Sequence, residues 1–126
     1  MGRRPRILLA GGIYHVFNRA SRGAHVFRDE AEADRFEALV ASTKKRDDFQ
    51  ILAWCVMSNR YNLAVRMGEV SLSRSMRFIQ NRFSQSYNGR HGVFSPFWQG
   101  RFRSRFVEDE EYLDTLVPGT FFGYSK

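Results

Sequence analysis

Residues 57–63, Met-Ser-Asn-Arg-Tyr-Asn-Leu, lie between two apolar runs and include Arg60 and Asn62, two polar residues separated by one position. In a strand, side chains two residues apart lie on the same face, so this pair would project together. An arginine keeps its positive charge and donates several hydrogen bonds, whereas an asparagine amide offers one neutral oxygen. The pair is therefore suited to holding a phosphate and is unsuited to binding a metal cation.

A second group of cations lies in residues 97–107, where apolar and basic side chains alternate. The alternation predicts a strand with Trp98, Phe102 and Phe106 on one face and a basic opposite face. The first loop and the neighbouring hairpin strand, near residues 60–66, would add further arginines on the side of this basic face. The candidate phosphate-binding residues of the sheet and its first loop are Arg19, Arg22, Arg60, Asn62, Arg66, Arg101, Arg103 and Arg105.

The overall charge agrees with a polyanionic partner. The chain has a net charge of +7 and a pI near 10.2, and 17 of its 20 basic residues are arginines. Cations placed on phosphates release condensed counterions, and the planar guanidinium matches phosphates and guanine edges. A solvated basic face without a ligand is the alternative interpretation of the same residues.

The sequence lacks the residues that several other kinds of site would require. Cys55 is the single cysteine, so no disulfide within the chain can form, and we expect it to be a buried small hydrophobe. His15, His25 and His91 are too far apart to suggest a metal site. No catalytic triad, phosphate-binding loop or dinucleotide motif is found, and no apolar run approaches the roughly 20 residues of a membrane span. We therefore expect a soluble, cytoplasmic protein with no metal site.

Hydrophobic periodicity predicts the elements that would position these residues. Apolar and β-branched runs predict strands over 12–19, 49–57, 61–66 and 97–107, with Ser58-Asn59 as the turn of a hairpin. Helices are predicted over 29–47, where Asp29 and Glu32 resemble a capping box, and over 109–116, before Pro118.

A further helix is predicted from a cap at Ser71 to Asn88-Gly89. Its apolar stripe is formed by Leu72, Met76, Ile79, Phe83 and Tyr87. Its opposite face is polar and basic, and three of its residues are further candidate nucleic-acid contacts. These three are Arg74, Arg77 and Asn81.

This order predicts an α+β fold of the ferredoxin-like βαββαβ(α) type, with a four-stranded antiparallel sheet and two helices on one face. We assign residues 1–117 to one domain and 118–126 to a divergent tail without recognisable period. The other sheet face would be open and basic. His15, Phe17 or Tyr14 could supply an aromatic platform there, although the octamer typical of RNA-recognition domains is absent.

The blocks IYHVFNRASRG, ILAWCVMSNRYNLAV, LSRSMRFIQNRFSQSYNGRHG and FWQGRFRSRFVEDEEYL, in this order, resemble the REP-associated branch of the single-tyrosine transposases, of the HUH nuclease group. The resemblance extends over about residues 5–117. It implies a role related to DNA transposition and recombination, with single-stranded or hairpin DNA as the partner, and allows for a homodimer.

The chain departs from this family at two positions that matter for cleavage. The family's hairpin has a His-x-His pair that binds a divalent metal such as Mg²⁺ or Mn²⁺, and here the matching residues are Arg60 and Asn62. The family's nucleophilic tyrosine would fall near residues 117–120, where no tyrosine occurs, and Tyr124 is a remote candidate. The resemblance therefore implies a transposase-like DNA-binding protein without metal and without catalysis, in which Arg60 keeps positive charge at the phosphate position.

Three alternatives remain at this point. The chain could be an active DNA-nicking transposase that uses Tyr124 or residues from a partner chain. It could be an evolutionary remnant without DNA affinity. It could also bind RNA through the open sheet face.

Overall fold

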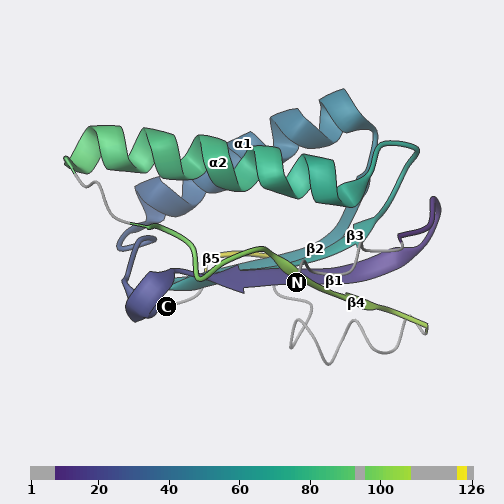
Figure 1. The fold of residues 1–126 in the computed structure, drawn as a ribbon, viewed down its shortest axis with the longest axis horizontal. Helices are drawn as coiled ribbons and strands as arrows, with labels where there is room; N and C mark the ends of the chain where they lie inside the picture. The colour runs from purple at the N-terminus through teal and green to yellow at the C-terminus, as the bar shows by residue number, and fades with distance from the viewer. Residues whose placement is uncertain (1–7, 93–95, 109–121, 125–126) are drawn as a thin grey trace, which may run out of the picture.

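The computed structural model describes residues 8–92, 96–108 and 122–124. It has an α+β fold in which two helices cover one face of a single sheet (Figure 1). The strands lie in the order β4-β1-β3-β2-β5. The elements are β1 (Ile13–Arg19), a 3-10 turn (Ser21–Gly23), α1 (Glu30–Asp47), β2 (Gln50–Met57), β3 (Arg60–Arg66), α2 (Leu72–His91), β4 (Arg103–Phe106) and β5 (Phe122–Tyr124).

The predicted ferredoxin-like arrangement of four antiparallel strands is confirmed. β1 pairs with β3 and β4, and β2 pairs with β3, all antiparallel. The structure adds a fifth strand, β5, which pairs with β2 in parallel and lies within the tail that showed no recognisable period. The predicted helix over 109–116 and the divergent residues 117–120 lie outside the described residues.

Helix α1 begins as predicted at Asp29, but with half of a capping box. The Asp29 carboxylate accepts a hydrogen bond from the Glu32 backbone N–H at 3.0 Å. The Glu32 carboxylate faces α2 instead and accepts two hydrogen bonds from Arg90 at 2.8 Å. Glu32 therefore ties the start of α1 to the end of α2.

The other end of α1 is joined to the start of α2 by a buried carboxylate. Asp47 accepts a hydrogen bond from the Ser75 hydroxyl at 2.7 Å and a two-pronged contact from Arg46. The contact with Arg46 and the Ser75 hydrogen bond lower the pKa of Asp47, against the opposing effect of burial. Gly68 passes so close to the Asp48 carbonyl that a Cβ atom would lie 2.3 Å from that oxygen, which explains the glycine.

Helix α2 carries the predicted apolar stripe on its buried side. All five stripe residues, Leu72 to Tyr87, are at most 5% exposed. The helix continues through Gly89 and ends at Gly92, whose φ of 65° suits glycine, so the end predicted at Asn88-Gly89 is wrong. Ser71 precedes the helix without a side-chain cap hydrogen bond.

An aromatic cluster fills the space between the helices and the sheet. Phe36 packs against Phe27, Tyr61 and Phe83, with ring centroids 4.9–5.4 Å apart. Trp98 packs edge-on against Tyr61 at 5.5 Å. These contacts join both helices to the sheet.

The segment before β4 differs from the single strand predicted over 97–107. Gly100 has a φ of 113°, which interrupts the strand, and regular pairing resumes at Arg103. Trp98 forms an isolated bridge with Ala20 and donates its indole N–H to the Gln80 carbonyl at 2.9 Å. Phe102 is buried as predicted, but Phe106 is 55% exposed and contacts Tyr14 edge-on at the sheet margin.

A buried polar network holds this irregular segment in place. The Gln80 Oε1 atom accepts hydrogen bonds from the Tyr61 hydroxyl at 2.6 Å and from Asn18 Nδ2 at 2.9 Å. Asn18 also donates to the Gly100 carbonyl at 3.0 Å and accepts from the Arg19 backbone N–H at 2.9 Å. The network connects α2, β1, β3 and the approach to β4.

Replacing Gln80 by Met is expected to lower the free energy of unfolding by about 2–3 kcal/mol, because the buried Tyr61 hydroxyl and Asn18 amide lose a shared acceptor. Urea denaturation followed by circular dichroism measures this. Gln85→Met, at an exposed position of the same helix, is the matched control and should change stability by less than about 0.5 kcal/mol. Equal effects of the two substitutions would show that the network contributes nothing.

Candidate functional site

A basic cleft lies where β1 ends and β3 begins, next to the approach to β4. Its volume is about 230 Å³. Three arginines from three different segments border it, and none of its lining residues is acidic. We call it the sheet-face cleft, and it is lined by Phe17, Asn18, Arg19, Arg60, Tyr61, Asn62, Gln99 and Arg103.

The strand register explains why these residues meet. Antiparallel pairing places Arg19 opposite Arg60 and Phe17 opposite Asn62, and β4 places Arg103 on the other side of Phe17. A hydrogen bond from the Gln99 backbone N–H to the Arg19 carbonyl, 3.0 Å long, fixes Gln99 beside them. Arg19, Arg60, Asn62 and Arg103, four of the residues selected from the sequence, thus share one cleft.

His15 and Phe17 form an aromatic pair on the sheet face opposite the helices. Their rings are stacked, with centroids 4.6 Å apart and planes inclined by 24°. The His15 Nε2 atom lies 2.9 Å from Asn62 Oδ1, so with the amide in this orientation Nε2 carries the hydrogen and donates it. Among the described residues, the buried Nδ1 atom has no partner. Burial lowers the pKa of His15, and the nearby charge of Arg105 acts in the same direction, while the Asn62 hydrogen bond opposes them.

The same sheet face carries two further features near the cleft. The Arg105 guanidinium lies 5.9 Å from the centre of the Phe17 ring. Cys55 pairs with Asn62 across the β2–β3 ladder and is half-buried, so its prediction as a buried core residue is wrong. Burial nevertheless raises the pKa of its thiol.

The residues at the positions of the family's metal pair do not fit a divalent cation. Arg60 is an exposed cation in the cleft, and Asn62 directs its one good oxygen ligand to His15. Within the described residues, no three His, Cys, Asp or Glu side chains are grouped as metal ligands. The side chains instead present hydrogen-bond donors and positive charge, the requirements of an anion site.

A second basic groove lies between α2 and the segment before β4. Its volume is about 700 Å³, and we call it the α2 groove. Arg101 lies here with Arg74, Arg77 and Asn81, so its predicted position on the open sheet face is wrong. The turn at Gly100 is the reason, because it breaks the alternation on which that prediction depended. The lining residues are Ser71, Ser73, Arg74, Arg77, Gln80, Asn81, Gly100, Arg101 and Phe102.

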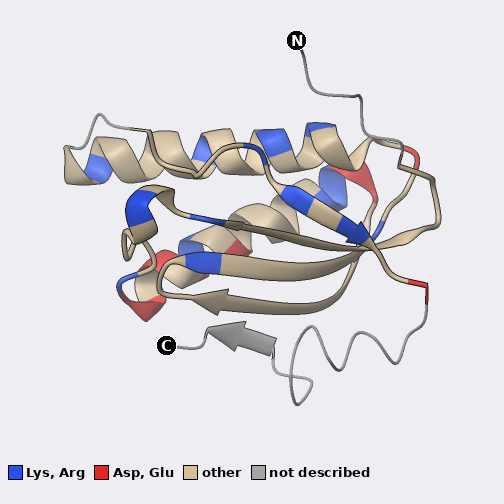
Figure 2. Cartoon of the chain, turned by 60° about the horizontal axis from the view of Figure 1, so that its bottom comes forward, with Lys and Arg blue, Asp and Glu red and all other residues tan. Residues whose placement is uncertain are grey.

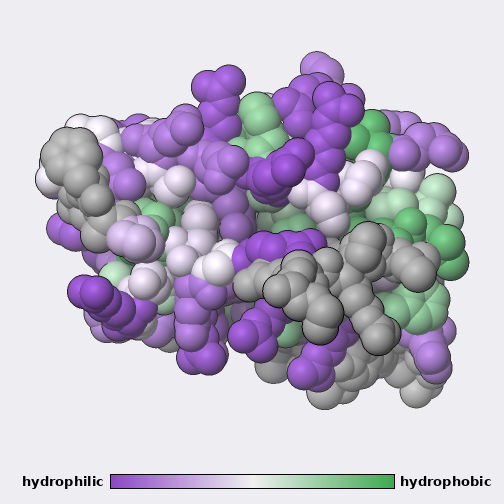
Figure 3. All heavy atoms as spheres, in the orientation of Figure 1, coloured by the Kyte–Doolittle hydropathy of each residue, from purple (hydrophilic) through white to green (hydrophobic). Residues whose placement is uncertain are grey.

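One stretch of chain separates the two basic sites. Gln99 and Arg103 line the sheet-face cleft, while residues 100–102 line the α2 groove. The sequence from Val70 to Val107 contains seven arginines and no acidic residue. Figure 2 shows basic positions repeated along α2 and on β4, and Figure 3 shows hydrophilic side chains projecting from the helical layer. The two sites therefore belong to one basic region around the β4 edge.

Two predicted contacts lie elsewhere. Arg22 is in the 3-10 turn, with a φ of 58°, and borders a different hollow near Tyr87 and Phe97. Arg66 shares the sheet face of Arg60 but lies at the far end of β3, about 20 Å away at the usual rise of about 3.4 Å per residue. The structure does not bring these two arginines to the cleft.

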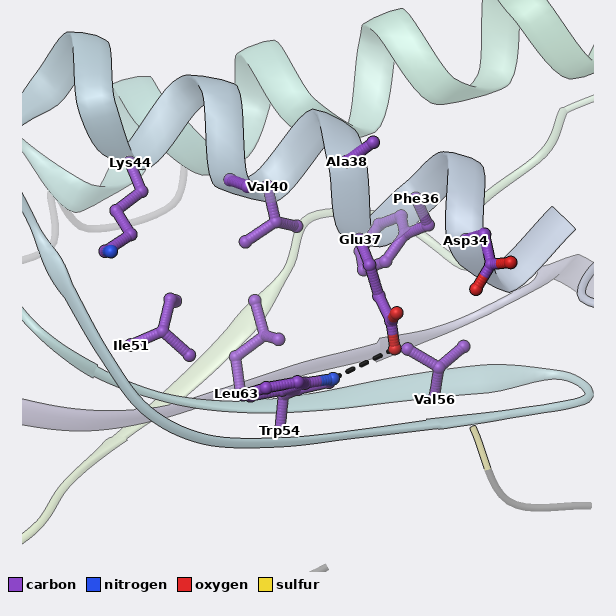
Figure 4. Close-up of a pocket in the computed structure, with 11 residues that line it drawn as sticks. Asp34, Phe36, Glu37, Ala38, Val40, Lys44, Ile51, Trp54, Val56 and Leu63 are labelled. Atoms are coloured by element: carbon purple, nitrogen blue, oxygen red, sulfur yellow. Dashed lines mark hydrogen bonds between the residues drawn. The ribbon is translucent and has the colours of Figure 1, made fainter. Parts of the chain in front are cut away.

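A further hollow of about 490 Å³ lies between α1 and β2 (Figure 4). Its walls are mostly apolar, and the Trp54 indole N–H donates to Glu37 Oε1 across it at 2.9 Å. None of its lining residues is an arginine, and its polar side chains do not point toward a common ligand position. Its lining therefore gives no reason to treat it as a functional site.

The family model described as "Transposase IS200 like" matches residues 10–117. The structure of a REP-associated tyrosine transposase bound to a REP hairpin is similar, with a TM-score of 0.72 and 18% identity, covering 92% of this chain and 68% of that one. A structure from Deinococcus radiodurans R1, described as a candidate transposase, has a TM-score of 0.64 and 12% identity, covering 90% and 92%. At these identities the structures show a shared fold alone.

No curated protein matches the chain. Among the described residues, no helix is both long enough and apolar enough to cross a membrane.

Lowering the pH from 7 to 5 is expected to destabilise the protein through His15. Its folded pKa lies below the ordinary 6.5, so the unfolded state binds the proton more readily, and stability falls as pH drops through about 6.5. Urea denaturation across this range measures the slope, and ¹⁵N NMR titration reports the imidazole directly. His15→Gln should reduce the slope, whereas His25→Gln, at an exposed position, should not. An NMR pKa for His15 above 6.5 would contradict this account.

Proposed function

The chain belongs to the IS200-like transposase family, and on this premise we propose that it is a DNA-binding protein that holds single-stranded or hairpin DNA without cutting it. The observation that carries the proposal is the sheet-face cleft, where Arg60 and Asn62 stand at the family's metal-ligand positions beside Arg19 and Arg103. In this proposal, guanidinium groups bind the phosphate at the place where the family resemblance would put a metal.

The chemistry of the cleft supports a phosphate ligand. Arginine donates two parallel hydrogen bonds to phosphate oxygens, and charge-assisted bonds of this kind are roughly twice as strong as neutral ones. Arg19, Arg60 and Arg103 approach from β1, β3 and β4, so that one backbone phosphate could be held from several sides. Without an acidic residue in the lining, nothing there would repel the strand.

The α2 groove supports a second stretch of contact. Arg74, Arg77 and Arg101 line it together with serine and asparagine side chains, which also donate to phosphates. It adjoins the sheet-face cleft across residues 99–103. A strand that occupies the cleft can therefore continue around the β4 edge into the groove. The similar transposase structure contains a REP hairpin, and we propose a hairpin ligand for this chain as well.

Loss of catalysis follows from the chemistry of the two side chains at the metal position, Arg60 and Asn62. Metal-assisted strand cleavage needs ligands that hold a cation near the scissile phosphate, and a positioned nucleophile. Arg60 repels a cation, and Asn62 is occupied by His15. Tyr124 lies in β5 opposite Val56, with β2 between it and β3. We propose that it is not a nucleophile, because no metal would activate the phosphate.

Replacing Arg60 and Arg103 singly by Ala is expected to weaken binding of a short single-stranded oligonucleotide by about fivefold at 0.1 M salt. The salt slope, the change of log K with log salt concentration, should become less steep by about 0.7 for each lost phosphate contact. Fluorescence anisotropy over a salt series measures both quantities. Arg35→Ala, on the exposed side of α1, is the charge-matched control and should leave both unchanged.

The same oligonucleotides, incubated with Mg²⁺ and Mn²⁺, test the absence of cleavage. Intact DNA and a metal-independent affinity are expected. Cut products that disappear in Tyr124→Phe would instead establish an active nicking enzyme. Binding that does not distinguish DNA from other polyanions would leave an evolutionary remnant, and preference for a matched RNA hairpin would make RNA the ligand.

Replacing Arg74 and Arg77 together by Ala is expected to have an effect that depends on DNA length. A hairpin with a single-stranded extension should lose roughly tenfold in affinity, because it reaches both the cleft and the α2 groove. A single strand of about four nucleotides, too short to occupy the cleft and the full length of the groove together, should lose much less affinity. Anisotropy with both ligands measures the difference. An equal loss for the two would show that the groove is not a separate contact.

A further inference from the structure

We propose that the sheet-face cleft also holds one unpaired nucleobase, stacked on Phe17, and that it prefers the keto bases thymine and guanine. This inference rests on the proposed function and specifies the ligand of the same site. It gives the chain a base contact in addition to phosphate contacts, and therefore a means of selecting unpaired nucleotides.

Phe17 has the position that a stacking platform needs. It lies on β1, between β4 and β3, on the sheet face opposite the helices. Phe17 is half-buried and is one of the residues that line the cleft. A base stacked on an aromatic side chain contributes to affinity whatever its sequence, because every base has a π face.

His15 stacks on one face of the Phe17 ring. The imidazole is 8% exposed and stacked on Phe17 at 4.6 Å, and its Nε2 atom is fixed by Asn62 at 2.9 Å. A ring held in this way loses little rotamer freedom when a ligand binds, which lowers the entropic cost of binding. The arrangement is therefore pre-organised rather than formed on binding.

The size and charge of the cleft suit a single base of a nucleotide. A volume of about 230 Å³ is below the roughly 300 Å³ at which pockets for drug-sized molecules begin, yet several times the ~30 Å³ share of one water. Arg103 and Asn62 flank Phe17 through strand pairing. A base over the ring would have its phosphate within reach of the arginines at the rim.

The polar groups around Phe17 are mostly donors. The guanidinium groups donate only, and Asn62 uses its oxygen on His15, so that its Nδ2 amide is what it can offer a ligand. Asn18 is engaged with Gln80 and Gly100. The exocyclic group at ring position 4 of a pyrimidine or 6 of a purine is an acceptor oxygen in thymine and guanine and an amino donor in cytosine and adenine. This contrast is the reason for the predicted preference.

The test compares octamers of dT and dC with an octamer of abasic tetrahydrofuran nucleotides, which has the same charge and no bases. Wild type should bind dT several-fold more tightly than dC, and the abasic strand more weakly than either. Phe17→Leu should weaken dT binding by roughly tenfold and leave abasic binding unchanged. Phe17→Trp, which keeps a stacking face, should retain dT affinity.

Phe106→Leu is the matched control, because Phe106 is an exposed phenylalanine of β4 that contacts Tyr14 and lines neither the cleft nor the α2 groove. It should affect none of the ligands. Circular dichroism and thermal melting check that each variant folds, and the Trp variant keeps the test valid if the Leu variant does not fold.

Three outcomes would contradict the proposals. If wild type binds dT in a salt-dependent way and Phe17→Leu binds it equally well, stacking on Phe17 is overturned and the phosphate-binding proposal survives. Equal dT and dC affinities would overturn the keto preference, and no binding of any strand by wild type would overturn both proposals.

Discussion

The buried amide of Gln80 is the contact on which both basic sites depend. It accepts from Tyr61 of β3 and Asn18 of β1, and its backbone carbonyl accepts from Trp98. Unpaired polar groups are costly in a core, so these partners hold one another in a single geometry. The consequence is a fixed path for residues 98–103, whose side chains separate the sheet-face cleft from the α2 groove.

The irregular path of that segment is what makes two sites from one run of arginines. In a regular strand, Arg101, Arg103 and Arg105 would all face the same way. Gly100 instead turns the chain, so that Arg101 joins Arg74 and Arg77 while Arg103 stays beside Phe17. In our proposal, a hairpin with an unpaired extension would match this shape, because one part could lie on the sheet face and the other in the α2 groove.

In our proposal, Arg60 and Asn62 account together for the anion site and for the absence of a metal site. Arg60 brings permanent positive charge, and Asn62 forms a hydrogen bond with His15. That hydrogen bond orients the imidazole stacked on Phe17. A position that serves catalysis elsewhere in the family thus serves, in our proposal, to position an aromatic surface.

Sequence patterns alone were sufficient to predict the fold class and the buried sides of β1, β3 and α2, but not those of residues 97–107. Alternation in β1 and β3 and the apolar stripe from Leu72 to Tyr87 are local patterns, and burial of apolar surface follows them directly. The sequence also identified Arg60 and Asn62, because motif positions are matched along the chain. The grouping of Arg101 with Arg74, the stacking of His15 on Phe17 and the pairing of β5 were decided by the tertiary structure alone. Each depends on a backbone turn, a strand register or a partner distant in the sequence, and periodicity carries no information about any of these.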